Sequence, residues 1–471
     1  MSNKKDGLFL RDGRNLVFTF VLVSSLFLLW GFCNGMIDVM DKHFQDELHL
    51  SKAQSAWVQF AHYLGYFIMA VPAGTLATKL GYKGGIITGL IIVAIGGFWF
   101  LPATHISALS QTGSVSPAMA FVAFLAGVCM IATGLAFLET IANPYTTVLG
   151  DQRFAATRIN LAQSCNGIGW IFGPIVGSVY FYSKDAMGHS TGNQTLYVPY
   201  LWVAVTVLVI AAIFFVSSIP DIKTEDDYHL DDAAPGESHS IWKHPHFVLA
   251  VAAQFFYVAA QAGIFSFFIN YMTAEVPPIP HSWGAGMAHL SANSGFFNDW
   301  LSGWFETAKS GVLQISNKGA SNLASLGFVC FLAGRFSGAA ILKRASAHRV
   351  LGLYGVANVV MCLVIFAKLG WISVACVFLS YFFMSIMYPT IFALGIFGLG
   401  ARAKKASSYI VMAIMGGALL PKVMGLVADK FNMSRGFIVP MFCFAFVAFY
   451  GYNWPKFSKA ESLHGVKTVG H

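Results

Sequence analysis

Apolar residues recur along the chain in twelve runs that are separated by shorter polar segments. Each run is close to the roughly 20 residues that a helix needs to cross the hydrocarbon core of a membrane. Because the runs contain few charged residues, the pattern predicts membrane-spanning helices. The predicted spans are 16–40, 54–79, 85–103, 118–148, 158–183, 197–219, 246–273, 322–342, 350–368, 371–399, 406–429 and 435–454.

Composition and charge place these spans in a bilayer. Hydrophobic residues make up 56% of the 471 residues and charged residues only 11%, far below the roughly one quarter charged that soluble domains carry. Most of the 29 Lys and Arg fall in alternate connecting segments, which predicts that both termini are cytoplasmic. This bias also accounts for the net charge of +8, so we expect no nucleic-acid partner.

The connecting segments divide the chain into two halves. We expect a cytoplasmic tail over 1–15, a six-helix half over 16–219, a charged linker over 220–245, a second six-helix half over 246–454 and a tail over 455–471. A long loop, 274–321, lies outside and can form short interfacial helices. Gly74 precedes Lys79 as Gly338 precedes Lys343. The predicted fold is therefore all-α, with twelve transmembrane helices in two pseudo-symmetric halves, as in many secondary transporters.

Residue types argue against an enzyme. The sequence shows no nucleophile and base arrangement, no H-E-x-x-H and no phosphate-binding glycine loop. The seven cysteines all lie in apolar spans without metal-ligand spacing, which is typical of small packing residues. We therefore expect neither a metal nor an organic cofactor.

Ionisable residues inside a span suggest function, because an isolated charge in the bilayer costs several kcal/mol. Glu139 lies about 18 residues, or roughly 27 Å along a helix, from the outer end of its span. It is a candidate proton carrier, and the alternative is a buried ion pair with Arg335 or Lys422, which also fall within spans. Asp38 closes the first span, where it is either a functional acid or an interface residue.

Polar side chains form stripes along several spans. Such amides and aromatics can bind sugar hydroxyls around an aromatic platform, or they can join neighbouring helices. Tyr388, which precedes Pro389, is either a further platform or a residue packed at a proline kink. The candidate sugar-binding residues are Trp30, Asn34 and Asp38 in the first span, Asn160, Gln163 and Asn166 in the fifth, Gln254, Tyr257 and Gln261 in the seventh, and Tyr388 in the tenth.

Seven motifs in order along the chain resemble the fucose-proton symporter family of the major facilitator superfamily. The resemblance covers the whole chain apart from the tails and the two long connecting segments. The motifs are WGFCNGMID at 30–38, PAG at 72–74 with LGYKGGIITG at 80–89, LETIANPY at 138–145, RINLAQSCN at 158–166, AQFFYVAAQ at 253–261, GRFSG at 334–338 and MSIMYPTIF at 384–392.

The resemblance implies a proton-coupled symporter that imports L-fucose, or a closely related monosaccharide, by alternating access across a bacterial inner membrane. Its acids for sugar recognition and proton coupling correspond to Asp38 and Glu139. Relatives that carry glucose or galactose tend to have an amide in place of Glu139, so this residue favours the fucose-like branch. The chain departs from the family at Gly35, where the fucose branch has a second amide, and at Lys422, where a neutral residue is expected.

Several alternatives stay open from the sequence. The chain is otherwise a glucose, galactose or N-acetylglucosamine transporter of the same family, with Na⁺ as a second candidate coupling ion. A drug exporter and a non-transporting sugar sensor are rival functions for the same fold. We expect a monomer whose partners are the monosaccharide, the proton and the lipid bilayer. Three lysines near the cytoplasmic ends of spans are candidate latches that pair with helix ends or acids in the outward-facing state. Alternatively, they only set the orientation of the chain in the membrane. They are Lys79, Lys83 and Lys343.

Overall fold

The computed structural model is mostly helical and describes residues 7–11, 13–150, 155–185, 187, 190–220, 241–293, 298–308, 311–342, 345–397 and 403–458. Most of the predicted linker and parts of both predicted tails lie outside these residues. The chain forms two compact units. The first contains Met1–Ser51, Trp57–Lys223 and Pro277–Ser325, and the second contains Lys52–Ala56, Thr224–Val276 and Leu326–His471.

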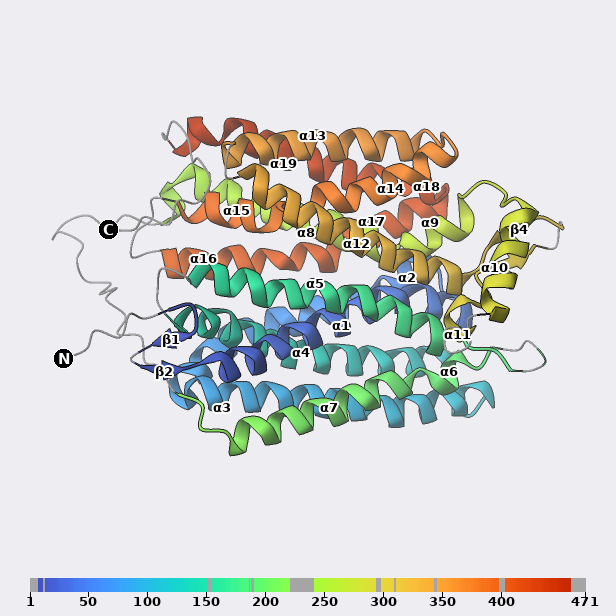
Figure 1. The fold of residues 1–471 in the computed structure, drawn as a ribbon. Coiled ribbons are helices and arrows are strands. Elements are labelled where there is room, and N and C mark those ends of the chain that lie inside the picture. The colour runs from blue at the N-terminus through green and yellow to red at the C-terminus, as the bar shows by residue number, and fades with distance from the viewer. Residues whose placement is uncertain are drawn as a thin grey trace. The chain divides into compact units, whose positions relative to one another are not determined.

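Long helices that lie side by side form the first unit (Figure 1). They are α1 (Val17–Glu47), α3 (Trp57–Gln111), α4 (Pro117–Val148), α5 (Ala155–Tyr180) and α7 (Tyr197–Val216), with the short α6 (Gly192–Thr195) and an N-terminal hairpin of β1 (Leu10–Arg11) and β2 (Arg14–Asn15). The second and third predicted spans are both in α3, which breaks at Gly81 with a φ of 67°, a conformation that glycine adopts readily. Between α1 and α5, a Cβ atom at Gly31 would lie 2.0 Å from the Asn166 carbonyl oxygen, so glycine allows the two backbones to approach.

Helices with more interruptions form the second unit. They are α8 (Pro245–Ser266), α9 (Phe268–Ala274), α12 (Asn317–Leu342), α13 (Ala347–Phe366), α14 (Trp371–Met384), α15 (Met387–Ile396), α16 (Ala403–Met412), α17 (Gly416–Lys430), α18 (Met433–Gly436) and α19 (Ile438–Ser458), with 3-10 turns at Ile241–Lys243 and Ala413–Met415. The predicted tenth span divides into α14 and α15, one turn before Pro389. Proline has no N–H for the carbonyl four residues earlier, which favours a break at this position.

Two segments at helix ends pack with the unit that does not contain most of their chain neighbours. The four-residue helix α2 (Lys52–Ser55) belongs to the second unit, where the Asp429 carboxylate accepts backbone N–H bonds from Lys52 at 3.0 Å and from Ala53 at 2.9 Å. Residues 277–325 belong to the first unit, and the Ser321 hydroxyl donates to the Pro174 carbonyl at 2.7 Å.

The predicted outer loop 274–321 has secondary structure of its own. It contains the helices α10 (His281–Asn293) and α11 (Asn298–Leu301). It also contains an antiparallel hairpin of β3 (Phe305–Thr307) and β4 (Leu313–Ile315), in which Glu306 pairs with Gln314. The sequence suggested short helices here but not the hairpin.

The exposed surface of the helices suits a bilayer. Phe18, Trp202, Phe336 and Phe442 are 61%, 64%, 61% and 66% exposed, and lipid is the solvent in which such side chains are stable. Ten helical segments of the described residues are long and apolar enough to cross a membrane. The two other predicted spans correspond to α5 and to α3 before Gly81.

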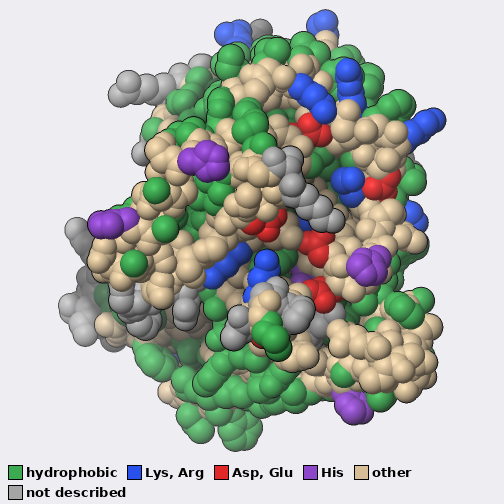
Figure 2. Space-filling view, turned by 90° about the vertical axis from the view of Figure 1, so that its right-hand side faces the viewer, with side chains coloured by type: hydrophobic (Ala, Val, Ile, Leu, Met, Phe, Trp, Pro, Cys, Tyr) green, Lys and Arg blue, Asp and Glu red, His purple; other side chains and the backbone are tan. Residues whose placement is uncertain are grey.

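Charged side chains are found instead at helix ends. Figure 2 views the end of the molecule that carries α10 and shows acidic and basic side chains close together there. Ion pairs at helix ends join Lys42 to Asp46 at 2.6 Å in the first unit and Lys368 to Glu275 at 2.8 Å in the second. Exposed ion pairs of this kind contribute little to the free energy of folding. Their location at helix ends indicates that these ends face water, whereas the apolar sides of the helices face lipid.

Candidate functional site

The acid of the first span is held by a residue that the sequence analysis did not select. Gln59 on α3 donates from Nε2 to Oδ1 of Asp38 on α1 at 2.9 Å. Both side chains are buried, with exposures of 2% for Gln59 and 8% for Asp38. Oδ2 of Asp38 has no hydrogen-bond partner among the described residues, so one carboxylate oxygen is fixed and the other is available.

A second contact between the same helices involves the candidate aromatic platform. The indole Nε1 of Trp30 donates to the hydroxyl of Tyr66. That hydroxyl also interacts with the side chain of Asn34 and lies within electrostatic range of Glu139 on α4. Trp30, Asn34 and Asp38 are spaced by four residues on α1, so they lie on one helix face as the sequence predicted.

Glu139 is half-buried in the middle of α4 and makes no hydrogen bond or ion pair with any described residue. Together with Trp30 it lines a small cavity whose other walls are Leu26, Phe27, Leu138 and Ala142. The cavity has a volume of about 10 Å³, whereas small-molecule pockets span several hundred Å³. This space suits a proton or a single water molecule, and a monosaccharide is too large for it.

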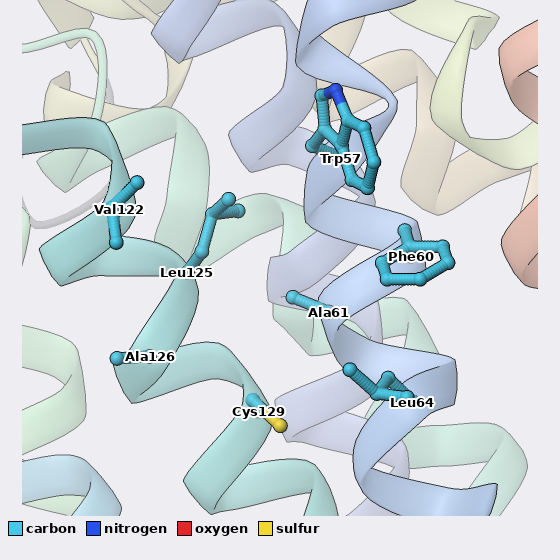
Figure 3. A pocket seen from close by; sticks show the side chains of 8 residues that line it. All are labelled: Trp57, Phe60, Ala61, Leu64, Val122, Leu125, Ala126 and Cys129. Carbon is cyan, nitrogen blue, oxygen red and sulfur yellow. The ribbon is translucent and has the colours of Figure 1, made fainter. Parts of the chain in front are cut away.

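The two faces of α3 have opposite chemistry. Figure 3 shows an apolar groove of about 290 Å³ between α3 and α4, lined by Trp57, Phe60, Ala61, Leu64, Val122, Leu125, Ala126 and Cys129. Almost no polar atom faces this groove, so it fits an acyl chain and not a sugar. Gln59 and Tyr66 are displaced by two residues, or about 200° around the helix, from Trp57 and Leu64. The polar face of α3 is therefore turned away from the groove and toward α1.

His62 extends this polar face. Its ring centre lies 5.0 Å from that of Tyr66 and 5.1 Å from that of Tyr63. The side chain is only 5% exposed, and its Nδ1 has no hydrogen-bond partner among the described residues. Gln59, His62, Tyr63 and Tyr66 together form the α3 polar face, which sequence reasoning missed although the residues recur at the helical spacing of three and four.

The amides of α5 do not behave alike. Asn166 is 4% exposed and donates from Nδ2 to the Phe27 carbonyl of α1 at 3.3 Å, which is the helix-joining role that the sequence left open. Gln163 is half-buried on the same helix. Asn160 belongs to α5, but its side chain lies outside the described residues.

In the second unit the seventh span contributes two buried groups with different surroundings. Gln254 is fully buried, and neither atom of its amide has a hydrogen-bond partner among the described residues. Tyr257, one turn further, donates to the Met384 carbonyl at 3.0 Å. Met384 is the last residue of α14, so its carbonyl is one that the helix itself leaves unsatisfied.

Tyr388 and Gln261 are two further candidate residues of the second unit. The Tyr388 ring centre is 6.4 Å from that of Tyr257, in an edge-to-face arrangement, and its side chain is half-buried. Gln261 is also half-buried, one turn beyond Tyr257 on α8. The structure thus brings Tyr257 and Tyr388 together, as the sugar-binding hypothesis requires of residues from the seventh and tenth spans.

Two cations lie within spans of the second unit. Arg335 on α12 is half-buried, packs its guanidinium 5.1 Å from the Phe331 ring centre and interacts electrostatically with Tyr257. Its Nε has no hydrogen-bond partner, and no described residue forms an ion pair with it. Lys422 is half-buried on α17. Glu139 belongs to the first unit and both cations to the second, so the alternative of an ion pair between Glu139 and Arg335 or Lys422 stays a prediction.

The candidate latch lysines differ in their contacts. Lys83 donates from Nζ to the carbonyls of Phe215 and Ser217, both at 2.9 Å, at the end of α7. A cation at a helix C-terminus is stabilising, so this contact joins α3 to α7 within the first unit. Lys79 is exposed, and Lys343 lies outside the described residues. All seven cysteines are free thiols, and no group of three His, Cys, Asp or Glu in the described part of the chain is placed to bind a metal.

Comparison with known proteins places this arrangement in a transporter family. The family model described as "Major Facilitator Superfamily" matches residues 19–394. The chain is 34% identical to the L-fucose-proton symporter of Escherichia coli over 93% of each chain. It is 30% identical to a glucose/galactose transporter of Brucella abortus over 93% of this chain and 94% of the relative.

A solved structure agrees with the sequence comparison. The crystal structure of the transporter FucP in its outward conformation matches with a TM-score of 0.63 and 32% identity, and the match covers 94% of this chain and 99% of FucP. The crystal structure of a D-xylose-proton symporter shares the fold at 12% identity, with a TM-score of 0.62. The fold is therefore that of a transporter with twelve transmembrane helices, and not of an enzyme. The chain belongs to the Major Facilitator Superfamily, and within it to the family of the L-fucose-proton symporter.

Proposed function

We propose that this protein is a sugar transporter that imports L-fucose, or a closely related monosaccharide, together with a proton. The observation that carries the proposal is the position of Glu139. It shares a small cavity with Trp30, whose indole is bonded to Tyr66. A carboxyl without a partner inside a span is expensive, and here it lies beside an aromatic pair of the kind that stacks on sugar rings. The 34% identity to a fucose-proton symporter supports the same conclusion.

The first unit supplies the proton chemistry in this proposal. Glu139 takes a proton from the outside, which removes a charge from the membrane interior and favours closure around the sugar. After the halves rock, the lower proton activity inside allows Glu139 to release the proton, and the sugar leaves. The small cavity shared with Trp30 gives the proton a place next to the sugar platform.

Each unit offers groups that can recognise sugar hydroxyls. Among the residues that the structure describes, Asp38 and Asn34 each have an acceptor oxygen without a partner, and Gln254 has an amide whose donor and acceptor are both unused. A monosaccharide presents several hydroxyls that both donate and accept, so it complements these groups. Tyr257 and Tyr388 complete the second group.

The energy available from coupling is sufficient. One proton that moves through 100 mV supplies about 2.3 kcal/mol, which corresponds to roughly fifty-fold accumulation from the potential alone. A chemical gradient of protons adds to this. We propose an inner-membrane location with both termini in the cytoplasm, because positive residues concentrate in the predicted inner segments.

A second sugar class has its own support. The glucose/galactose transporter of Brucella abortus is 30% identical to the chain. Glu139 favours the fucose-like branch, whereas Gly35 stands where that branch has a second amide. Competition between the sugars for uptake decides between the two classes.

The test is uptake into proteoliposomes that contain the purified protein. Labelled L-fucose is offered under an inward proton gradient, with and without a protonophore, and D-glucose, D-galactose and N-acetylglucosamine serve as competitors. We expect accumulation of L-fucose that the protonophore abolishes. Accumulation that follows an imposed sodium gradient instead, or competition by a panel of unrelated lipophilic cations, would overturn the proposal.

A further inference from the structure

The contact between Gln59 and Asp38 constrains the chemistry of the acid. The amide of Gln59 donates through Nε2 to Oδ1 at 2.9 Å. In a protonated carboxyl group one oxygen is the carbonyl acceptor and the other carries the proton. Because Oδ1 accepts the bond from Gln59, Oδ1 is the carbonyl oxygen when Asp38 is protonated. A proton on Asp38 is therefore carried by Oδ2, which is also the oxygen without a hydrogen-bond partner among the described residues and so the one most open to a sugar hydroxyl.

The free oxygen has a matching neighbour. Oδ1 of Asn34 is buried and has no hydrogen-bond partner among the described residues, as is also true of Oδ2 of Asp38. The two residues are one helical turn apart on α1, with exposures of 7% and 8%. Two unused acceptors on one face, about one turn apart, fit a ligand that presents two hydroxyl donors.

We propose that Gln59 is a positioning residue: it holds Oδ1 so that Oδ2 of Asp38 and Oδ1 of Asn34 are presented as a pair to two hydroxyls of the sugar. The inference rests on the proposed function, because it concerns how Asp38 is oriented toward a bound sugar. Without the amide donor the carboxyl group can turn about its last side-chain bond, and the pair of acceptors is no longer fixed. Sugar affinity then falls, while the movement of the two halves is unaffected.

Two substitutions at this position separate geometry from packing. Gln59→Met keeps the length of the side chain and removes the donor. Gln59→Glu keeps the shape and donates only when the new carboxyl is protonated. Gln194→Met, on the exposed surface of α6, is the matched control for the loss of a glutamine in the same unit.

The measurements are initial rates of sugar uptake and equilibrium binding of labelled sugar to the purified protein. For Gln59→Met we expect the KM and the Kd to rise about tenfold, while the maximal rate and the final accumulation at saturating sugar stay within twofold of the native values. For Gln59→Glu we expect the KM to approach the native value as the pH falls. The titratable side chains on the neighbouring helices, His62, Tyr63, Tyr66, Glu139 and Cys165, are unchanged, so each variant is compared with the native protein at the same pH.

The outcomes distinguish the two levels of the proposal. If the native protein neither binds nor accumulates any of the sugars, the proposed function fails. If the native protein transports and Gln59→Met has the native KM, or loses maximal rate without a change of KM, the positioning role fails. If Gln59→Met does not fold, Gln59→Glu decides alone, and a KM that does not respond to pH overturns the inference.

Discussion

The two units hold their polar groups in different ways. In the first, acids dominate, and both acids lie on long unbroken helices: Asp38 on α1 is bonded to Gln59, and Glu139 on α4 lies within electrostatic range of Tyr66. In the second, neutral or positive groups dominate and two candidates lie at a helix break: Tyr257 bonds to the end of α14, and Tyr388 is in the first turn of α15. Gln254 has no partner among the described residues.

The difference suggests a division of labour. Proton uptake needs an acid in a fixed, dry setting, which continuous helices supply. Closure around a sugar needs backbone that can change its hydrogen bonds, and the junction of α14 and α15 supplies a carbonyl that is bonded to a side chain, at Met384, and a proline. We therefore expect substitution of Glu139 in the first unit to affect coupling, and substitutions of the candidate residues in the second unit to affect affinity and stability.

The largest expected effect is the loss of coupling in Glu139→Gln. The amide cannot take up or release a proton, so the gradient no longer drives accumulation, while exchange of labelled for unlabelled sugar continues. Accumulation under a proton gradient, measured in proteoliposomes, should fall to about one-fold. Glu306→Gln in the exposed hairpin is the control. Accumulation by Glu139→Gln equal to that of the native protein would move the proton site to Asp38.

Arg335→Met tests the cation of the second unit. Arg335 interacts with the candidate sugar residue Tyr257, and bonds from charged donors are worth about 1.5–3 kcal/mol. If the guanidinium binds a sugar hydroxyl, its loss should weaken affinity tenfold or more. Stability should not fall, because the guanidinium has no ion-pair partner among the described residues and an unpaired charge in a span is itself unfavourable. The measurements are sugar binding and thermal unfolding in detergent.

Arg435 provides the matched control for this experiment. Its guanidinium packs 4.1 Å from the Phe366 ring centre and the side chain is exposed, so Arg435→Met removes a similar contact outside the candidate site. We expect native sugar affinity in the control. A marked loss of stability in Arg335→Met with unchanged affinity would assign Arg335 a purely structural role.

Hydropathy predicted the number and order of the spans well, because lipid contact depends only on local composition. The ends were less accurate. The helix α1 continues to Glu47, seven residues beyond the predicted end at residue 40, since charged residues such as Asp41 and Lys42 end an apolar run but not a helix. Pro389 gave a local signal for the break between α14 and α15, whereas the interruption at Phe267, between α8 and α9, had none.

The candidate site was predicted in part. Trp30, Asn34, Asp38 and Glu139 were selected because each is a polar or aromatic residue in an otherwise apolar run. Gln59 and Tyr66 were missed because their importance depends on which face of α3 meets α1, and that is decided by tertiary packing. The signal in the sequence was the recurrence of Gln59, His62, Tyr63 and Tyr66 at helical spacing.

Gln254→Leu and Gln59→Leu compare two buried amides. Gln254 has no hydrogen-bond partner among the described residues, and Gln59 is bonded to Asp38. A buried amide without hydrogen bonds is destabilising, so leucine should raise the stability of the sugar-free protein by about 1 kcal/mol and weaken sugar binding about fivefold. Gln59→Leu should do the reverse to stability, because it removes the bond to Asp38. Thermal unfolding with and without sugar measures both effects. Destabilisation by Gln254→Leu would show that the amide has a structural partner.

The smallest effect is expected from Tyr257→Phe, which removes one hydroxyl from the break between α14 and α15. The Met384 carbonyl then loses its bond from α8, and loss of one such bond costs about 1 kcal/mol. Thermal unfolding should show this, whereas Tyr354→Phe, a buried tyrosine whose hydroxyl makes no hydrogen bond with any described residue, should unfold like the native protein. Sugar affinity should change less than in Gln254→Leu. If Tyr257→Phe instead abolishes transport at native stability, the hydroxyl contacts the sugar, and the second unit takes part in recognition through Tyr257 more than through Gln254.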